Sequence, residues 1–230
     1  MTVQRRSQEC QANCGSSPTW ALWRRTIAQA AGWTVVLALT GCALVDKPLR
    51  PAVYDFGPGV LALASADNAP TLRALSLPEV EASSALDSSA VLYRLAYTDS
   101  QQLQPYAHAR WSMAPAQLVR QRLRDALSQQ RVVLNSTDGN ITLAAPSRVL
   151  NVELEEFSQL FDAPSRSYGL VRLRATLTQP SPTGDTLLGQ RSFVVQRPAP
   201  TADAPGGVRA LTAATDAVVQ EIEQWLKRFP

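Results

Sequence analysis

The feature that most limits how this chain can fold is a regular alternation of apolar and polar residues in residues 148–157 and 168–178. The apolar positions are Leu150, Val152 and Leu154 in the first stretch and Val171, Leu173, Ala175 and Leu177 in the second. A period of two places alternate side chains on opposite faces, so each stretch predicts a β-strand with one buried and one solvated face. The solvated positions include Glu153, Glu155, Arg172 and Arg174. If the strands pair antiparallel, these opposite charges share one face and attract one another.

The alternation resumes in residues 187–196, after a turn predicted at residues 180–185 around Gly184, and the three segments together predict a meander. Shorter strand candidates lie at residues 71–77, 90–97 and 131–134. Asp138-Gly139 is a turn signal after the last of these.

Two helices complete the prediction. The first begins at Pro115, a residue that a first helical turn tolerates, and its apolar residues recur every three or four positions as far as Leu127. Its basic residues are expected to form a solvated face: Arg120, Arg122 and Arg124. Residues 197–207 are rich in proline and glycine and predict a loop, followed by a helix from Val208 to Phe229. The predicted fold class is α+β, with two amphipathic helices packed on one face of a mainly antiparallel sheet.

The N-terminal segment has the features of an export signal. Arg24 and Arg25 precede an uncharged stretch, residues 26–39, and small residues then lead to Cys42. Residues 1–41 are therefore predicted to be a signal peptide.

The tetrad Leu39-Thr40-Gly41-Cys42 resembles the bacterial lipobox. The resemblance implies that the peptide bond before Cys42 is cut and that the Cys42 thiol carries a diacylglycerol, with palmitate among its expected acyl chains. More than one acyl chain anchors a protein stably to a membrane. Ala43, rather than aspartate, follows the cysteine, which by the sorting rule for such lipoproteins implies the outer membrane.

The expected domain organisation follows from this signal. Residues 42–52 contain two prolines and little apolar periodicity, and they are expected to form a lipidated tether. Residues 53–230 are expected to form the folded domain. Synthesis is predicted to start near Leu22, which makes residues 1–21 an extension. The alternative to cleavage is a retained anchor, because residues 26–45 form an uncharged stretch as long as a membrane-spanning helix.

Charge and composition exclude several classes of function. From Cys42 onward the chain has 18 basic and 18 acidic residues, so the sequence pI of about 9.0 belongs mostly to the signal and does not indicate nucleic-acid binding. The 188 residues after Cys42 contain no cysteine, which excludes a disulfide framework there. His108 is the only histidine, which argues against the usual zinc sites and catalytic triads.

The sequence does not favour an enzyme, and it predicts no cofactor. The carboxylate pair that could support hydrolysis is Glu153 and Glu155, which lie two positions apart on one strand face. Arg172 and Arg174 are expected to neutralise them.

Several further motifs together resemble one family. They are Tyr54-x-Phe56 soon after the tether, Tyr93-Arg94 in a strand, and Tyr106-x3-Arg110-Trp111-x3-Pro115 before the first helix. With the lipobox, they are similar to the ABC-type transport auxiliary lipoprotein family, which includes the paraquat-inducible lipoprotein PqiC. The resemblance covers about residues 42–229. It implies a non-enzymatic lipoprotein at the periplasmic face of the outer membrane, partnered with an MCE-domain protein of an ABC-type lipid transport system.

Arg110 and Trp111 are the candidate partner interface in this PqiC-like pattern, although a tryptophan beside a helix start also fits the core. Tyr93 and Tyr97 are core candidates, and His108 is expected in a solvent-exposed loop. Three alternatives stay open: a structural outer-membrane lipoprotein of another envelope assembly machine, a direct lipid carrier, and assembly into a homo-oligomer.

Overall fold

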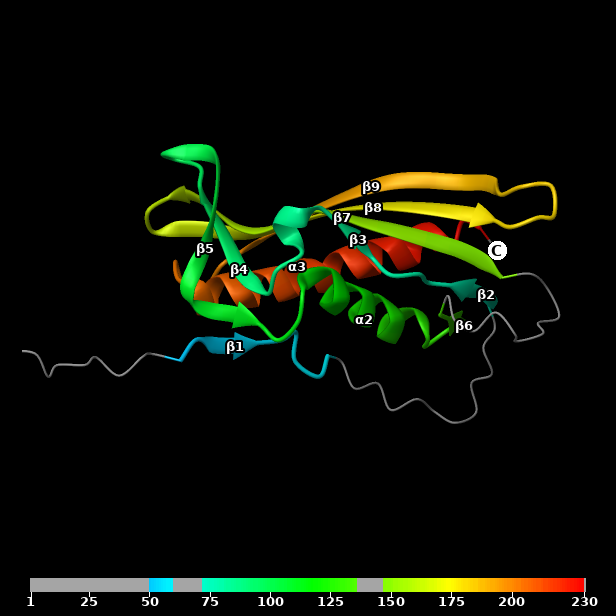
Figure 1. The fold of residues 1–230 in the computed structure, drawn as a ribbon, viewed down its shortest axis with the longest axis horizontal. Coiled ribbons are helices and arrows are strands. Elements are labelled where there is room, and N and C mark those ends of the chain that lie inside the picture. Colours follow the sequence, from blue (N-terminus) through cyan, green and yellow to red (C-terminus); the bar gives the residue numbers. More distant parts are fainter. Residues whose placement is uncertain (1–49, 60–71, 136–146, 230) are drawn as a thin grey trace, which may run out of the picture. The chain divides into compact units, whose positions relative to one another are not determined.

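Three long antiparallel strands form the largest part of the sheet in the computed structural model, which describes residues 50–59, 72–135 and 147–229. They are β7 (Arg148–Ala163), β8 (Arg166–Gln179) and β9 (Thr186–Pro198). This confirms the predicted meander, and Figure 1 shows the three strands side by side. Strand β7 is longer than the alternation indicates. A bulge at Glu155, which shifts the register between Leu154 and Glu156, interrupts the alternation within the strand. The bulge changes which positions face inward, so that Leu154 and Phe157 are both buried.

The second edge of β7 is covered by three short strands that run parallel to it. They are β2 (Leu72–Ser76), β3 (Glu81–Ala82) and β4 (Ala90–Leu95). Each pairs with a later part of β7 than the one before, at Arg148–Val149, Glu153–Leu154 and Gln159–Phe161 respectively. A short 3-10 helix, Ser84–Leu86, lies between the last two. The chain therefore advances along β7 in steps.

The remaining strands make the sheet mixed rather than mainly antiparallel, which corrects the sequence prediction. They are β5 (Asp99–Trp111), antiparallel to β4, β1 (Ala52–Tyr54), parallel to β5, and β6 (Arg131–Leu134), parallel to β2. Among the described strands, five pairings are parallel and three are antiparallel. Parallel pairing needs a connection that crosses the sheet. The connection between the parallel neighbours β2 and β6 includes helix α2 (Pro115–Leu127), which follows β5.

Strand β5 was not predicted, because its 13 residues lack a regular apolar alternation. Most of its side chains are exposed or half-buried. The strand forms because β4 and β1 supply its hydrogen-bond partners on both sides. In Figure 1, β5 curves past the first turns of the last helix, and β1 lies beside that helix.

Helices α2 and α3 (Ala204–Leu226) lie on the same side of β7, β8 and β9, as Figure 1 shows. A Cβ atom at Gly169 of β8 would lie 2.4 Å from the backbone carbon of Ala210, so glycine permits the close approach of α3. The core between sheet and helices includes Leu123, Leu173 and Ile222, each fully buried.

Helix α3 begins at Ala204, inside the segment predicted to be a loop. Asp203 caps it: its carboxylate accepts a hydrogen bond from the Gly206 backbone N–H over 2.8 Å. Pro205 stands in the first turn, where its missing N–H has no cost. Gly206 and Gly207 are helical despite their low propensity, because both are buried, and a Cβ at Gly207 would meet Gln159 of β7.

The predicted bounds of α2 and β6 are confirmed, and so is the turn between β8 and β9, where Gly184 has a φ of +124°. The predicted signal peptide, Cys42 and the Asp138-Gly139 turn lie outside the described residues. None of the described helices is long and apolar enough to span a membrane.

Candidate functional site

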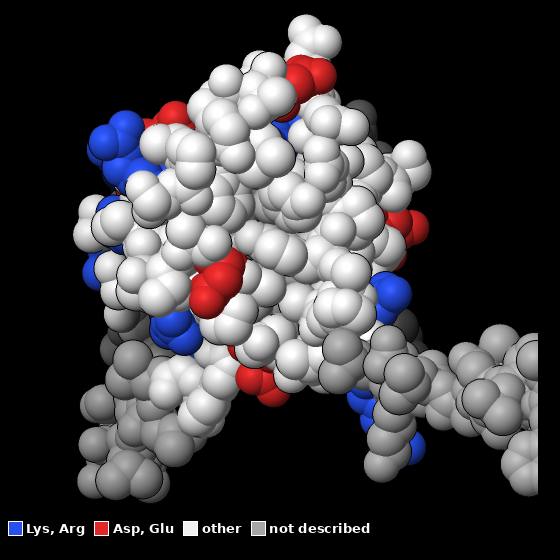
Figure 2. Space-filling model, turned by 90° about the vertical axis from the view of Figure 1, so that its left-hand side faces the viewer, with Lys and Arg blue, Asp and Glu red and all other residues white. Residues whose placement is uncertain are grey.

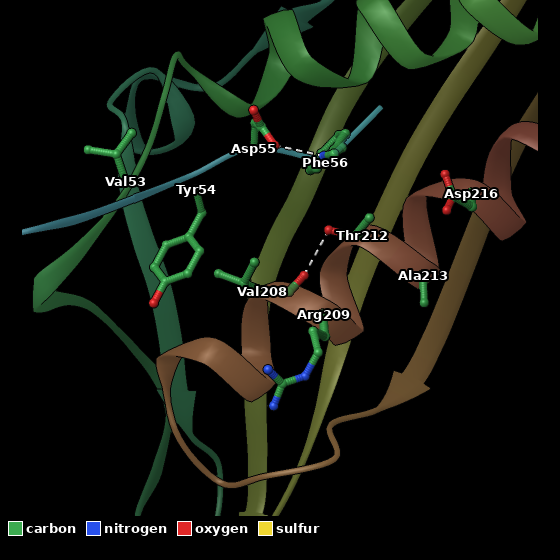
Figure 3. A pocket seen from close by; sticks show the side chains of 10 residues that line it. Val53, Tyr54, Asp55, Phe56, Val208, Arg209, Thr212, Ala213 and Asp216 are labelled. Carbon is green, nitrogen blue, oxygen red and sulfur yellow. Dashed lines mark hydrogen bonds between the residues drawn. The ribbon is translucent and has the colours of Figure 1, made fainter. Parts of the chain in front are cut away.

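A groove of about 470 Å³ lies between β1 and the first half of α3. One wall comes from residues 53–57, which we call the entry segment, and the other from α3. Figure 3 shows Tyr54 of the entry segment and Val208 of α3 on opposite sides of this groove. Its polar lining residues include Arg209, Thr212 and Asp216 of α3. The groove is amphipathic, which suits binding of a partner segment or an apolar chain with a polar end.

A tight turn shapes the entry segment. The Asp55 carboxylate accepts a hydrogen bond from the backbone N–H of Gly57 over 2.7 Å. Gly57 has a φ of +66°, a left-handed conformation that favours glycine. The turn directs the Phe56 side chain into the core, where it is only 8% exposed.

Arg122 of α2 fastens the entry segment to both helices. Its guanidinium donates a hydrogen bond to the Phe56 carbonyl oxygen and forms an ion pair with Asp216 of α3 over 3.1 Å. The guanidinium carbon also lies 5.8 Å from the centre of the Phe56 ring. Burial raises the pKa of the Asp216 carboxyl, and the Arg122 charge opposes this rise. Arg122 therefore links three segments that are far apart in the sequence.

The prediction that the arginines of α2 form a solvated face is wrong for Arg120 and Arg122, and Arg124 is half-buried and donates a hydrogen bond to the Asn135 side chain. The Arg122 side chain is 12% exposed and the Arg120 side chain 19%. Arg120 donates hydrogen bonds to the carbonyl oxygens of Leu77 and Pro78, after β2. Arginine can bury its aliphatic stem while its guanidinium bonds to backbone, so helical periodicity does not separate this role from solvation.

A second groove, of about 600 Å³, lies between α2 and α3, is lined by Arg122, and shares Phe56 and Asp216 with the first groove. Acidic residues line it: Asp125, Asp216 and Glu223. The two grooves therefore meet beside Arg122, at the point where its guanidinium binds the Phe56 carbonyl oxygen. Sequence reasoning missed this arrangement, and the Tyr54-x-Phe56 motif followed by Gly57-Pro58-Gly59 was its only signal.

The structure separates the two residues that were predicted to form a partner interface. Arg110 is exposed on β5 and pairs in register with Val53 of β1, whose side chain is 67% exposed. Trp111 is 2% exposed, and its ring lies 5.5 Å from Phe56 and 5.6 Å from Phe157, centre to centre. Arg110 is thus available to a partner at the surface, whereas Trp111 supports the entry segment from the core.

The other aromatic predictions have mixed outcomes. Tyr93 is half-buried, and its ring centre is 4.6 Å from that of Tyr106. The Tyr106 hydroxyl donates to the Gln159 side-chain oxygen over 2.8 Å, and burial raises the pKa of Tyr106. Tyr97 is 46% exposed, so its assignment to the core is wrong, because it lies in the turn that follows β4. His108 is exposed as predicted, but it lies in β5 rather than in a loop.

Of the two arginines expected to neutralise the carboxylate pair considered for hydrolysis, Arg174 does so. Its guanidinium forms ion pairs with Glu153, over 3.3 Å, and with Glu155. Within residues 50–59, 72–135 and 147–229, no group of three or more His, Cys, Asp or Glu side chains is arranged to hold a metal ion.

Charges on one end of the molecule are scattered. Figure 2 shows the end at the left of Figure 1, where most of the surface is uncharged and both acidic and basic side chains occur. This face does not carry the clustered basic surface that nucleic-acid binding requires.

Comparisons with known proteins identify relatives by family and by fold. A family model described as "ABC-type transport auxiliary lipoprotein component" matches residues 54–223. The crystal structure of a protein from Xanthomonas campestris is similar, with a TM-score of 0.57 and 18% identity over 70% of this chain and 87% of that one. The crystal structure of an uncharacterized protein has a TM-score of 0.55 and 14% identity over 77% of this chain and 99% of that one. No curated protein matches the sequence.

Proposed function

This chain belongs to the family of ABC-type transport auxiliary lipoprotein components, and on that premise we propose that it is a non-enzymatic component of an intermembrane lipid transport system. The family match, which covers the domain from Tyr54 to Glu223, is the observation that carries the proposal. In this proposal, the chain is held at the periplasmic face of the outer membrane and docks onto an MCE-domain protein of the transporter.

Anchoring is assigned to Cys42, the last residue of the lipobox-like tetrad. Ala52, the first residue of β1, lies ten positions after Cys42. Such a segment spans at most about 35 Å when fully extended. The entry segment and its groove would therefore lie within that distance of the membrane surface, which limits where a partner can approach.

Docking is assigned to the region around the entry segment. Arg110 and Val53 are exposed neighbours there, and the groove between β1 and α3 lies beside them. The acidic side chains near this region are engaged in structural contacts: Asp55 holds the turn and Asp216 pairs with Arg122. These roles favour recognition over catalysis.

The proposal is tested by a pull-down from crosslinked membranes that compares the wild type with Cys42→Ala, read by mass spectrometry. Val45→Ala is the matched control, because it changes a residue of the predicted tether and keeps the Cys42 thiol. Incorporation of radiolabelled palmitate is measured on all three. We expect an MCE-domain protein with the wild type and the control, and loss of both palmitate and partner with Cys42→Ala.

Other results would redirect the proposal. Recovery of a different envelope complex, with no MCE-domain protein, would favour the structural outer-membrane lipoprotein. Unchanged membrane association without palmitate would mean that residues 26–45 are a retained anchor. Lipid that remains bound to the purified domain, quantified by mass spectrometry after extraction, would favour a direct carrier.

A further inference from the structure

Strand β9 ends the sheet with a long hydrogen-bonding edge. Among the described strands it pairs only with β8, over residues 186–198. Every second residue of an edge strand directs its N–H and C=O groups outward, so about six residues of β9 offer them to another chain. Helix α3 packs on the inner face, where the Trp225 and Phe193 ring centres are 5.9 Å apart. No described strand lies along the outer edge, and Figure 1 shows β9 at the margin of the sheet.

The composition of β9 is unusual for an edge. Its side chains Leu187 and Val194 are 61% and 53% exposed. Arg191 and Arg197 are also exposed, and the strand contains no acidic residue. Asp185, the nearest acid along the chain, precedes the strand. Exposed apolar side chains favour added contacts at this edge, and the two arginines decide which contacts are favourable.

We propose that the open edge of β9 binds an extended, acidic segment of a partner protein as an additional β-strand. Arg191 and Arg197 are six positions apart and therefore share a face, with about 20 Å between them. A partner strand with carboxylates six positions apart would place one beside each arginine. On the opposite face Val194 lies between Ser192 and Gln196, which suits uncharged or apolar partner side chains.

Charge disfavours a second copy of this chain at the same edge. Two β9 strands side by side would bring four arginines together with no acid from either strand. Like charges on neighbouring strands are destabilising. The acidic segment of another protein has no such cost, and its carboxylates gain from the exposed arginines.

The identity of the partner as a transport component rests on the proposed function, whereas the chemistry of the edge does not. Two experiments separate them. In the first, p-benzoylphenylalanine replaces Val194 in the full-length protein in cells, and the same replacement at Val53 of β1 is the comparison. We expect the adduct at position 194 to contain the MCE-domain protein recovered by the wild type, at a segment with at least two carboxylates.

Charge reversal tests the role of the arginines in that adduct. We expect Arg191→Glu with Arg197→Glu to lower its yield about tenfold, since two weak attractions become repulsions. Arg73→Glu on β2, where the arginine is exposed and lies outside both the docking region and β9, is the matched control and should leave the yield unchanged. Thermal unfolding of each variant confirms that it is folded. A tenfold loss with Arg73→Glu alone would overturn the assignment to β9.

The second experiment needs no natural partner. The probe is a synthetic ten-residue peptide of alternating threonine and valine with two glutamates six positions apart, and the control carries lysine in place of glutamate. We expect the glutamate peptide to slow amide hydrogen exchange in β9 and the lysine peptide to bind at least tenfold more weakly. Equal binding of both peptides, binding of neither, or an adduct between two copies of the chain at position 194 would overturn the proposal. Slowed exchange without recovery of any MCE-domain protein would sustain the edge site and contradict the proposed function instead.

Discussion

The two edges of β7 are built in different ways. On one side, β8 pairs along nearly the whole strand and is joined to β7 by a turn of two residues, Pro164 and Ser165. On the other side, β2, β3 and β4 each cover a few residues and approach in parallel. The first edge depends on contacts between sequence neighbours. The second depends on segments that begin more than 60 residues earlier in the chain, at Glu81 for β3 and Glu153 for its partner.

This difference explains where the grooves lie. The β7–β9 meander and α3 form a densely packed side, with Gly169 against Ala210. The entry segment joins from the other side through few contacts, above all those of the Phe56 ring and of Arg122. Surfaces that are assembled from separate segments leave grooves between them, whereas continuous pairing of neighbours does not.

The largest expected effect is at the packed side. Gly169→Val should cost about 4 kcal/mol or more in the free energy of unfolding, because its side chain would overlap the α3 backbone, which cannot move aside without separating from β8. Gly189→Ala is the control, since its Cβ would meet the end of the Phe229 side chain, which can rotate. Urea unfolding should show a much smaller loss for the control. Equal losses would mean that α3 can shift on the sheet.

A smaller loss is expected where β7 passes from one type of neighbour to the other. Gln159 is fully buried, accepts from Tyr106 of β5 and donates to the Ser167 hydroxyl of β8 over 2.8 Å. Gln159→Leu should cost about 3 kcal/mol because the buried Ser167 hydroxyl and the half-buried Tyr106 hydroxyl each lose a partner. The double variant with Tyr106→Phe should lose less than the sum of the single variants in thermal unfolding. Strict additivity would show that the two side chains act independently.

On the assembled side, Arg122→Gln should cost about 2 kcal/mol at pH 7, since the Phe56 carbonyl and Asp216 lose a charged partner. The pKa of Asp216 is raised in the fold, so stability falls as pH rises from its ordinary value of 3.8 through the raised value. Without Arg122 the pKa rises further, and the variant should lose more stability at pH 7 than at pH 4.

Urea unfolding at both pH values measures this difference. Asp216→Asn in the Arg122→Gln background removes the carboxyl and should remove the additional loss at pH 7. If the loss persists, another group is responsible for the pH dependence.

The smallest effect is expected on the solvated face of the meander. Arg174→Gln removes ion pairs with Glu153 and Glu155, but Arg174 and Glu153 are both nearly half exposed. Such pairs contribute about 0–1 kcal/mol, and salt screens them. Thermal unfolding in low salt should therefore show a small loss that disappears in 1 M NaCl. A loss that persists in high salt would indicate that Arg174 packs rather than pairs.

Patterns with a short period predicted the strands and the helix whose buried face they specify. The alternation in residues 148–178 predicted β7 and β8, and the three- and four-residue spacing from Pro115 to Leu127 predicted the bounds of α2. The same reasoning missed β5, whose side chains lack alternation, and placed the start of α3 too late because glycine and proline usually mark loops. In both cases the neighbouring strands and the buried Gly206 and Gly207 outweighed local propensity.

For the candidate site, too, one part was predictable from the sequence and another part was not. Family membership was predicted from motifs such as Tyr54-x-Phe56 and Arg110-Trp111, and the family match confirms it. The separate positions of Arg110 at the surface and Trp111 in the core were not predictable, because neighbours in a strand face opposite sides and only the assembled sheet determines which side is buried.

By itself the sequence determined the local elements, since the spacing of apolar residues sets which side of a strand or helix can be buried. The predicted location of the chain also rests on the sequence alone, since the tetrad ending in Cys42 is a local motif. Only the tertiary structure decided that β2, β3 and β4 run parallel along β7, that Arg122 joins Phe56 to Asp216, and that β9 keeps an open edge. Each of these depends on which distant segments meet, and a pattern confined to one segment carries no information about its neighbours in space.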